Sequence, residues 1–248
     1  MDFDFRQPRH LLAFVLLSIS FLVLIVYAAV TYFEPSPSTS GIGNFTGVMQ
    51  LIVEIYLVAF SLILVIILMV VIPMLWYVLV NRLRFPEILQ RLRLSREHLG
   101  QALFWGIITA IAALMLSVIL DIVILQFGVD ISKLSNIPQL QQLFPLPALL
   151  VLITVQPIAE EIFFRGFLLE KISGFTGPTI GVIGSAVLFG VAHLSYGMLY
   201  TAVMATGLGL LFGIVVVRTK NLYASMLAHI LVNITSITLF LLGKSIGV

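Results

Sequence analysis

The stretch Gln156-Pro157-Ile158-Ala159-Glu160-Glu161-Ile162-Phe163-Phe164-Arg165-Gly166 places two adjacent carboxylates and an arginine in an otherwise apolar segment. An ionised group left unpaired inside a bilayer costs roughly 2.5 kcal/mol or more, so these charged residues are expected to be paired or functional. On a helix, Glu161 and Arg165 lie one turn apart and can pair along one face. Glu160 is rotated by about 100° from Glu161 and is predicted to stay free. The stretch therefore predicts a membrane helix with one acid held and one acid available.

The composition is that of an integral membrane protein. Of the 248 residues, 60% are hydrophobic and only 10% are charged, and the mean hydropathy of +1.17 is far above that of soluble domains. The formal net charge is only +2, which makes nucleic-acid binding a poor interpretation and leaves membrane lipid as the expected surroundings. The chain has no cysteine, which excludes disulfides, thiolate zinc ligands and a cysteine nucleophile.

Apolar stretches along the chain predict an all-α, polytopic bundle of about seven transmembrane helices, with six to eight as the range. The expected spans are 11–33, 48–80, 99–127, 148–169, 179–194, 199–217 and 222–242. We interpret the first as a retained span rather than a signal peptide, because it is longer than a typical signal core. The second exceeds a bilayer core of about 30 Å, so it must tilt, kink at Pro73 or protrude.

The basic residues predict a cytoplasmic N-terminus and an external C-terminus. Five arginines crowd the segment 81–96, whereas the loop at 34–41 contains no Lys or Arg and is expected to be external. Threading seven spans in this orientation leaves only Lys133 and Lys244 outside, as the positive-inside rule requires.

We expect one structural domain, in which residues 1–144 form the N-terminal helices with the arginine-rich loop and residues 145–248 form the core that carries the polar motifs. The last three spans are dense in small residues, with Gly209 and Gly213 spaced as a GxxxG pair. Such spacing lets helix backbones approach closely.

Besides Arg165, six ionisable residues lie at apparent membrane depth, where they should face a protein interior or a wet cavity. They are Glu54, Asp121, Glu160, Glu161, His193 and His229. The turn near 176–177 lies about 16 residues after Glu160 and about 17 before His193, so an antiparallel hairpin brings both to one level. His229 shares a helix face with Asn233, but its depth of ~13 Å from the cytoplasmic end differs from ~24 Å for Glu160. Glu54 and Asp121 have no predicted partner.

A carboxylate, two imidazoles and a carboxamide in a low-dielectric cavity can activate water and stabilise a tetrahedral oxyanion, which suits hydrolysis of an acyl bond. Other hydrolase chemistries fit worse. His193 is followed by Leu-Ser-Tyr-Gly, so the zincin pattern His-Glu-x-x-His is absent. Asp121 is the only Asp in a span, which leaves no aspartyl dyad. A serine nucleophile would need a paired base, and Gly184-Ser185-Ala186 lacks the usual Gly after the Ser.

Three motifs, in order on late hydrophobic spans, resemble those of the CPBP family of intramembrane proteases, also called the Abi or CAAX prenyl protease 2 family. They are Glu160-Glu161-x-x-x-Arg165, Phe189-x-x-x-His193 and His229-x-x-x-Asn233. The resemblance covers roughly 145–243 and implies a glutamate-dependent membrane endopeptidase. Its expected substrate is a membrane-anchored peptide or protein, of the prenylated CAAX type in the type member.

The resemblance also implies roles for these residues. Glu160 would be the water-activating base and His193 its partner, while His229 and Asn233 would bind the oxyanion or a metal. Glu161 and Arg165 would orient the site as an ion pair, and Phe189 would pack against it and help to shape the cavity. A metalloprotease remains an open alternative, with zinc as cofactor at Glu160, His193 and His229.

Two other functions remain open on the residues alone. Buried acids and histidines can form the proton relay of a proton-coupled transporter, although we find no inverted repeat of the kind that many transporters contain. A non-catalytic family member could act by binding, as an immunity or scaffold protein. Binding alone, however, does not require a buried base.

Overall fold

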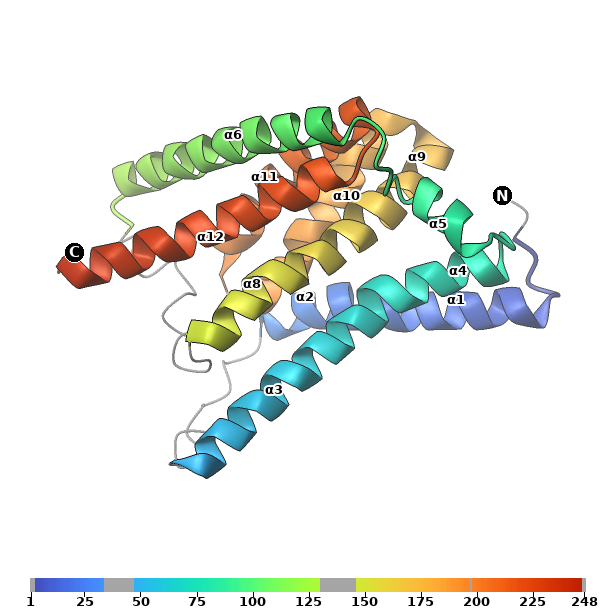
Figure 1. The fold of residues 1–248 in the computed structure, drawn as a ribbon, viewed down its shortest axis with the longest axis horizontal. Helices are drawn as coiled ribbons and strands as arrows, with labels where there is room; N and C mark the ends of the chain where they lie inside the picture. The colour runs from blue at the N-terminus through green and yellow to red at the C-terminus, as the bar shows by residue number, and fades with distance from the viewer. Residues whose placement is uncertain (1–2, 34–46, 130–145, 197, 247–248) are drawn as a thin grey trace.

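The computed structural model describes residues 3–33, 47–129, 146–196 and 198–246, and the regular structure in these ranges is entirely helical (Figure 1). Six helices among them are long and apolar enough to cross a membrane. They are Pro8–Thr31, Val48–Leu79, Leu99–Gln126, Pro178–Ser195, Leu199–Thr219 and Tyr223–Gly243. The protein is therefore an all-α integral membrane protein. The expected external loop at 34–41 and Lys133 lie outside the described residues.

One further long helix carries the acidic pair. It runs as α8 (Leu146–Glu161), a π-helical segment η5 (Ile162–Leu168) and α9 (Leu169–Thr176). The side chains from 159 to 169 are all buried, so its charges face protein rather than lipid. Together with the six apolar helices, it gives about seven spans in the described part of the chain, as the sequence predicts.

The second apolar stretch changes its helical geometry just before Pro73. It consists of α3 (Val48–Ile66), the π-helical turn η3 (Ile67–Val71) and α4 (Ile72–Leu79). Proline has no N–H, and its ring collides with the carbonyl four residues earlier, here that of Met69. A π-turn relieves this collision by widening the helix. The first span contains a similar turn, with α1 (Pro8–Phe21), η1 (Leu22–Val26) and α2 (Tyr27–Thr31).

The arginine-rich segment is folded onto the bundle. It contains a short helix, α5 (Phe85–Arg91), in a stretch where the sequence predicts only a loop. Beyond α5, the backbone N–H of Leu222 donates to the carbonyl of Arg93 at 2.9 Å, and Asn221 Nδ2 donates to the carbonyl of Ser95 at 2.9 Å. The segment is therefore fixed to the connection between the last two helices.

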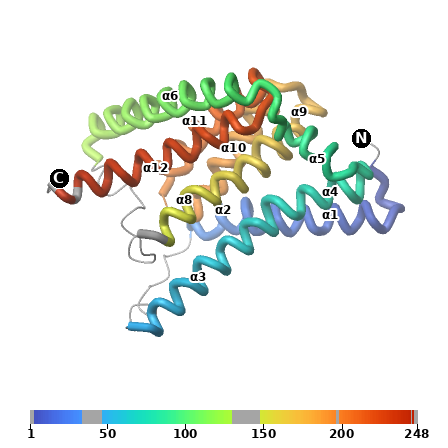
Figure 2. The backbone as a smooth tube through the Cα atoms, viewed as in Figure 1, coloured from blue at the N-terminus to red at the C-terminus, as the bar shows by residue number. Residues whose placement is uncertain are grey.

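The remaining helices pack through small residues. They are α6 (Leu99–Gln126), α10 (Pro178–Ala192), α11 (Leu199–Thr219) and α12 (Tyr223–Ile246), and α6 lies along α12 (Figure 2). A Cβ at Gly106 would come within 2.7 Å of the Ala224 carbonyl oxygen, and one at Gly209 within 3.1 Å of the Ala186 Cα. The predicted close approach of these helices is present.

We expect Gly190→Ala to destabilise the fold strongly. A Cβ there would lie 1.9 Å from Thr206 Oγ1 and 2.6 Å from the backbone oxygen of Ala202 on α11, so α10 and α11 would have to separate, at a cost of about 1–3 kcal/mol. Gly184→Ala on the same helix is the control, because its nearest neighbour is the flexible tip of Ile172 at 3.3 Å. Thermal unfolding in detergent measures both, and equal midpoints would contradict the assignment of a tight α10–α11 contact.

Candidate active site

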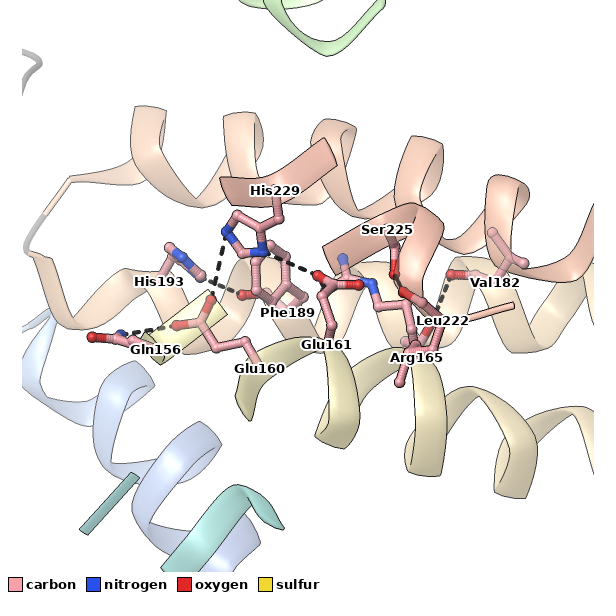
Figure 3. A network of polar contacts seen from close by, with 11 residues as sticks. Gln156, Glu160, Glu161, Arg165, Val182, Phe189, His193, Leu222, Ser225 and His229 are labelled. Atoms are coloured by element: carbon pink, nitrogen blue, oxygen red, sulfur yellow. Dashed lines mark hydrogen bonds and ion pairs between the residues drawn. The ribbon is translucent and has the colours of Figure 1, made fainter. Parts of the chain in front are cut away.

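Residues from three helices converge on one buried cluster (Figure 3). Glu160 and Glu161 end α8, and Arg165 follows in η5. His193 lies where α10 passes into the short 3₁₀ helix η6 (His193–Tyr196), and His229 comes from α12. Pro157, inside α8, and the π-helical η5 both alter the regular ladder around the acidic pair, and π-turns are frequent at functional sites.

The predicted ion pair between Glu161 and Arg165 is present and fully buried. Arg165 Nη1 lies 2.9 Å from Glu161 Oε1, and both side chains are 0% exposed. The same oxygen lies 3.0 Å from His229 Nδ1. A carboxylate beside an arginine is an acceptor, so this network assigns a proton to His229 Nδ1. His229 is thereby held at one ring nitrogen.

Glu160 contacts two neighbours. Its Oε1 accepts a hydrogen bond from Gln156 Nε2 at 2.9 Å, and its Oε2 lies 3.7 Å from His229 Nε2. The expectation that Glu160 stays free is wrong, because Gln156 one turn earlier and His229 on α12 both reach it. The i, i+4 spacing that predicts the Glu161–Arg165 pair also relates Gln156 to Glu160, so this contact was predictable from the sequence.

His193 is held by its own helix. Its Nδ1 lies 2.8 Å from the carbonyl oxygen of Phe189, and since a carbonyl only accepts, the ring proton belongs on Nδ1. Glu160 is near enough to interact with His193 electrostatically, and the two side chains lie on the same side of the cluster in Figure 3. The hydrogen bond to Phe189 thus fixes the orientation of the His193 ring.

The Phe189 ring packs against Arg165 and both histidines of the cluster. The Arg165 guanidinium carbon lies 4.1 Å from the centre of this ring, and the centres of the His193 and His229 rings lie 4.4 and 5.7 Å from it. Arg165 Nε and Nη2 have no hydrogen-bond partner in the described part of the chain, so the aromatic face supplies part of the stabilisation of this buried cation.

The predicted difference in depth between His229 and Glu160 does not keep them apart. His229 reaches both glutamates, so the turn between α9 and α10 must extend further along the bundle than the turn between α11 and α12. Asn233, one turn beyond His229, is partly exposed and makes no hydrogen bond to the residues that the structure describes.

Two acids that the sequence left without partners have them in the structure. Asp121 on α6 accepts a hydrogen bond from the Tyr200 hydroxyl on α11. Glu54 accepts one from Gln50 Nε2 at 2.9 Å on the exposed face of α3. Neither acid belongs to the cluster around Glu160.

The donor atoms do not fit the zinc site that was left open at Glu160, His193 and His229. Within the described ranges no three His, Asp or Glu side chains converge as metal ligands. Both histidines bond through Nδ1, His229 to Glu161 and His193 to the Phe189 carbonyl. Zinc-ligating histidines are held in the same way, so it is the spacing of the side chains that does not fit. The chemistry below therefore uses protein groups and water alone.

We expect Glu161→Gln to destabilise the protein by about 3 kcal/mol or more, because it leaves the buried Arg165 cation without its counter-ion. The double variant Glu161→Gln/Arg165→Met removes that unpaired charge and should recover much of the loss. Thermal unfolding of the purified variants in detergent measures both. A single variant as stable as the unmodified protein would show that the ion pair does not hold the site together.

Comparison with known proteins agrees with the motif resemblance. Residues 142–235 match the family model of the type II CAAX prenyl endopeptidases, Rce1-like. The protein YdiL of Bacillus subtilis (strain 168), named as a membrane peptidase, is 30% identical over 148 residues. This match spans 56% of the present chain and 57% of YdiL, so little more than half of that relative is covered. No solved structure matches. Both matches support a likeness of this chain to the CPBP family of membrane endopeptidases.

Proposed function

We propose that this protein is an intramembrane endopeptidase in which Glu160 activates water for attack on a peptide bond. One observation carries the proposal. Glu160, a buried carboxylate, faces the Nε2 of His229 at 3.7 Å, while the Nδ1 of the same ring is held by a second carboxylate, Glu161. The family match supports peptide-bond hydrolysis as the reaction.

In the proposed reaction Glu160 takes a proton from water as the oxygen bonds to the carbonyl carbon of the substrate. The carbonyl oxygen becomes an oxyanion in the tetrahedral intermediate. Glu160 then gives its proton to the nitrogen of the leaving amine as the carbon–nitrogen bond breaks. The products are an amine and a carboxylic acid, and Glu160 returns to its starting state.

The imidazoles and the carboxamide are suited to stabilising the oxyanion. His193 and His229 are each anchored through Nδ1, so Nε2 becomes a donor when the ring is protonated. Asn233 has no hydrogen-bond partner among the described residues, which leaves its amide N–H groups to donate to a bound substrate. Donors aimed at a developing negative charge in a dry site are among the strongest catalytic contributions.

The substrate that we propose is a peptide held in the membrane by a lipid chain or by its own apolar segment. The candidate base lies inside a bundle of membrane-spanning helices, where a soluble peptide would need to leave water. The description of the matched family favours a prenylated CAAX peptide. The distribution of basic residues supports a cytoplasmic N-terminus for this arrangement.

We expect Glu160→Gln to abolish cleavage, because the amide cannot take the proton of the attacking water. Purified protein in liposomes would be assayed against prenylated CAAX peptides, their unprenylated forms and transmembrane peptides. Glu54→Gln is the matched control, since it removes a carboxylate that also accepts from a glutamine one turn earlier but lies outside the cluster. Unchanged turnover in a folded Glu160→Gln protein would refute Glu160 as the base.

We expect Gln156→Leu to lower kcat about tenfold with little change in KM. Gln156 touches Glu160 Oε1, and loss of this hydrogen bond frees the carboxylate to rotate away from His229, which weakens orientation more than substrate binding. Gln50→Leu, which removes the equivalent partner of Glu54, is the control. A rise in KM at constant kcat would instead assign Gln156 to substrate binding.

A further inference from the structure

A second polar cluster, separate from the Glu160 site, joins α4, α5 and α9, which gather at one end of the bundle in Figure 1. Its centre is Glu170, which accepts a hydrogen bond from the Tyr77 hydroxyl at 2.5 Å. The Glu170 carboxylate also lies 3.1 Å from Arg91 Nε and 3.1 Å from Lys171 Nζ. We call Glu170, Tyr77, Arg91 and Lys171, together with the neighbouring Arg93, the Glu170 cluster.

The Glu170 cluster lies at a membrane surface. Tyr77 is two residues from the end of α4 at Leu79. Arg93, just beyond α5, donates from Nη1 to the carbonyl of Val216 at 3.2 Å, in the last turn of α11. Two membrane-spanning helices thus end here. Such ends lie at the level of lipid headgroups rather than at the bilayer centre.

The cluster holds more positive than negative charge. Glu170 is one carboxylate beside three cations, Arg91, Arg93 and Lys171. Burial lowers the pKa of Arg93 below its ordinary value, and the attraction of Glu170 offsets this only in part. The Lys171 ammonium lies over the rings of Tyr77 and Phe167, at 4.4 and 5.4 Å from their centres.

The other acids of the arginine-rich segment do not balance this charge. Glu87 Oε2 accepts a hydrogen bond from the backbone N–H of Arg84 at 2.6 Å, and Glu97 is exposed. A partly desolvated group of cations without enough counter-charge favours the binding of an anion.

Arg91 is the group that an anion can reach. Its side chain is 56% exposed, and only Nε is used in the contact with Glu170. Its two terminal nitrogens make no hydrogen bond within the described part of the chain. A guanidinium presents such nitrogens as a planar fork that matches two oxygens of a phosphate.

We infer that the Glu170 cluster is a phosphate-binding site whose occupant is the headgroup of an anionic phospholipid. The phosphate contacts the terminal nitrogens of Arg91, and the excess charge of Arg93 and Lys171 strengthens its binding. A lipid is the natural source because the cluster lies where spanning helices end, and anionic headgroups concentrate next to basic groups at that level. This site is independent of the chemistry proposed for Glu160.

The test compares lipid binding by the full chain and by two charge-matched variants. Native mass spectrometry of the protein in detergent would count bound phosphatidylglycerol and phosphatidylcholine at equal concentrations. We expect a preference for phosphatidylglycerol that Arg91→Gln weakens about tenfold, as for loss of a hydrogen-bonded charge. Arg96→Gln removes the same charge from an exposed position of the same segment outside the cluster, and should weaken binding less than twofold.

Three results would overturn the site. They are no preference for phosphatidylglycerol, no loss in Arg91→Gln, and equal losses in both variants, the last of which indicates diffuse surface charge. Thermal unfolding of each variant shows whether a loss reflects misfolding, and Arg91→Lys, which keeps the charge, should retain part of the preference. Displacement of phosphatidylglycerol by equimolar inorganic phosphate would keep the phosphate site but overturn the lipid as its occupant.

Discussion

The candidate site depends on the ion pair between Glu161 and Arg165. Two charges at zero exposure are stable only when each is compensated by the other and by further polar contacts. Here Glu161 Oε1 also accepts a hydrogen bond from His229 Nδ1, and the Phe189 ring covers the Arg165 guanidinium. The pair therefore fixes the rotation of α12 and the position of α10 relative to the helix that carries both glutamates. Without it, His229 would have no reason to face Glu160.

The absence of a side chain at Gly209 serves both the close packing of α10 against α11 and the placement of Arg165. A Cβ at Gly209 would come within 2.9 Å of Arg165 Nη2 and 3.1 Å of the Ala186 Cα. The glycine thus leaves room both for the guanidinium and for the approach of α10 to α11. The small residues that the sequence shows in this region serve the buried charge as well as the general packing of membrane helices.

Local features of the fold could be predicted from the sequence. The spans follow hydropathy, and the Glu161–Arg165 pair follows from the helical repeat, because both depend on residues close together in the chain. The contact of Tyr200 with Asp121 could not be predicted, since it depends on how α11 is rotated against α6. The contact of Glu161 with His229 likewise joins residues far apart in the sequence. The hydrophobic pattern of α12 does not predict which of its faces turns toward Glu161. The arginine-rich segment folds onto the α11–α12 connection, and this could not be predicted because its high charge is typical of a solvated loop.

The two adjacent glutamates have different partners because neighbouring positions on a helix face different sides. Glu161 points to a permanent cation, Arg165, so its charge is already compensated through Oε1. Glu160 touches the neutral amide of Gln156 and a histidine, and neither is a permanent cation. A carboxylate oxygen that is not committed to a permanent cation can accept a hydrogen bond from a water molecule. The same helix turn thus separates a structural acid from one that can exchange a proton with water, and this difference is why we assign the base to Glu160 and not to Glu161.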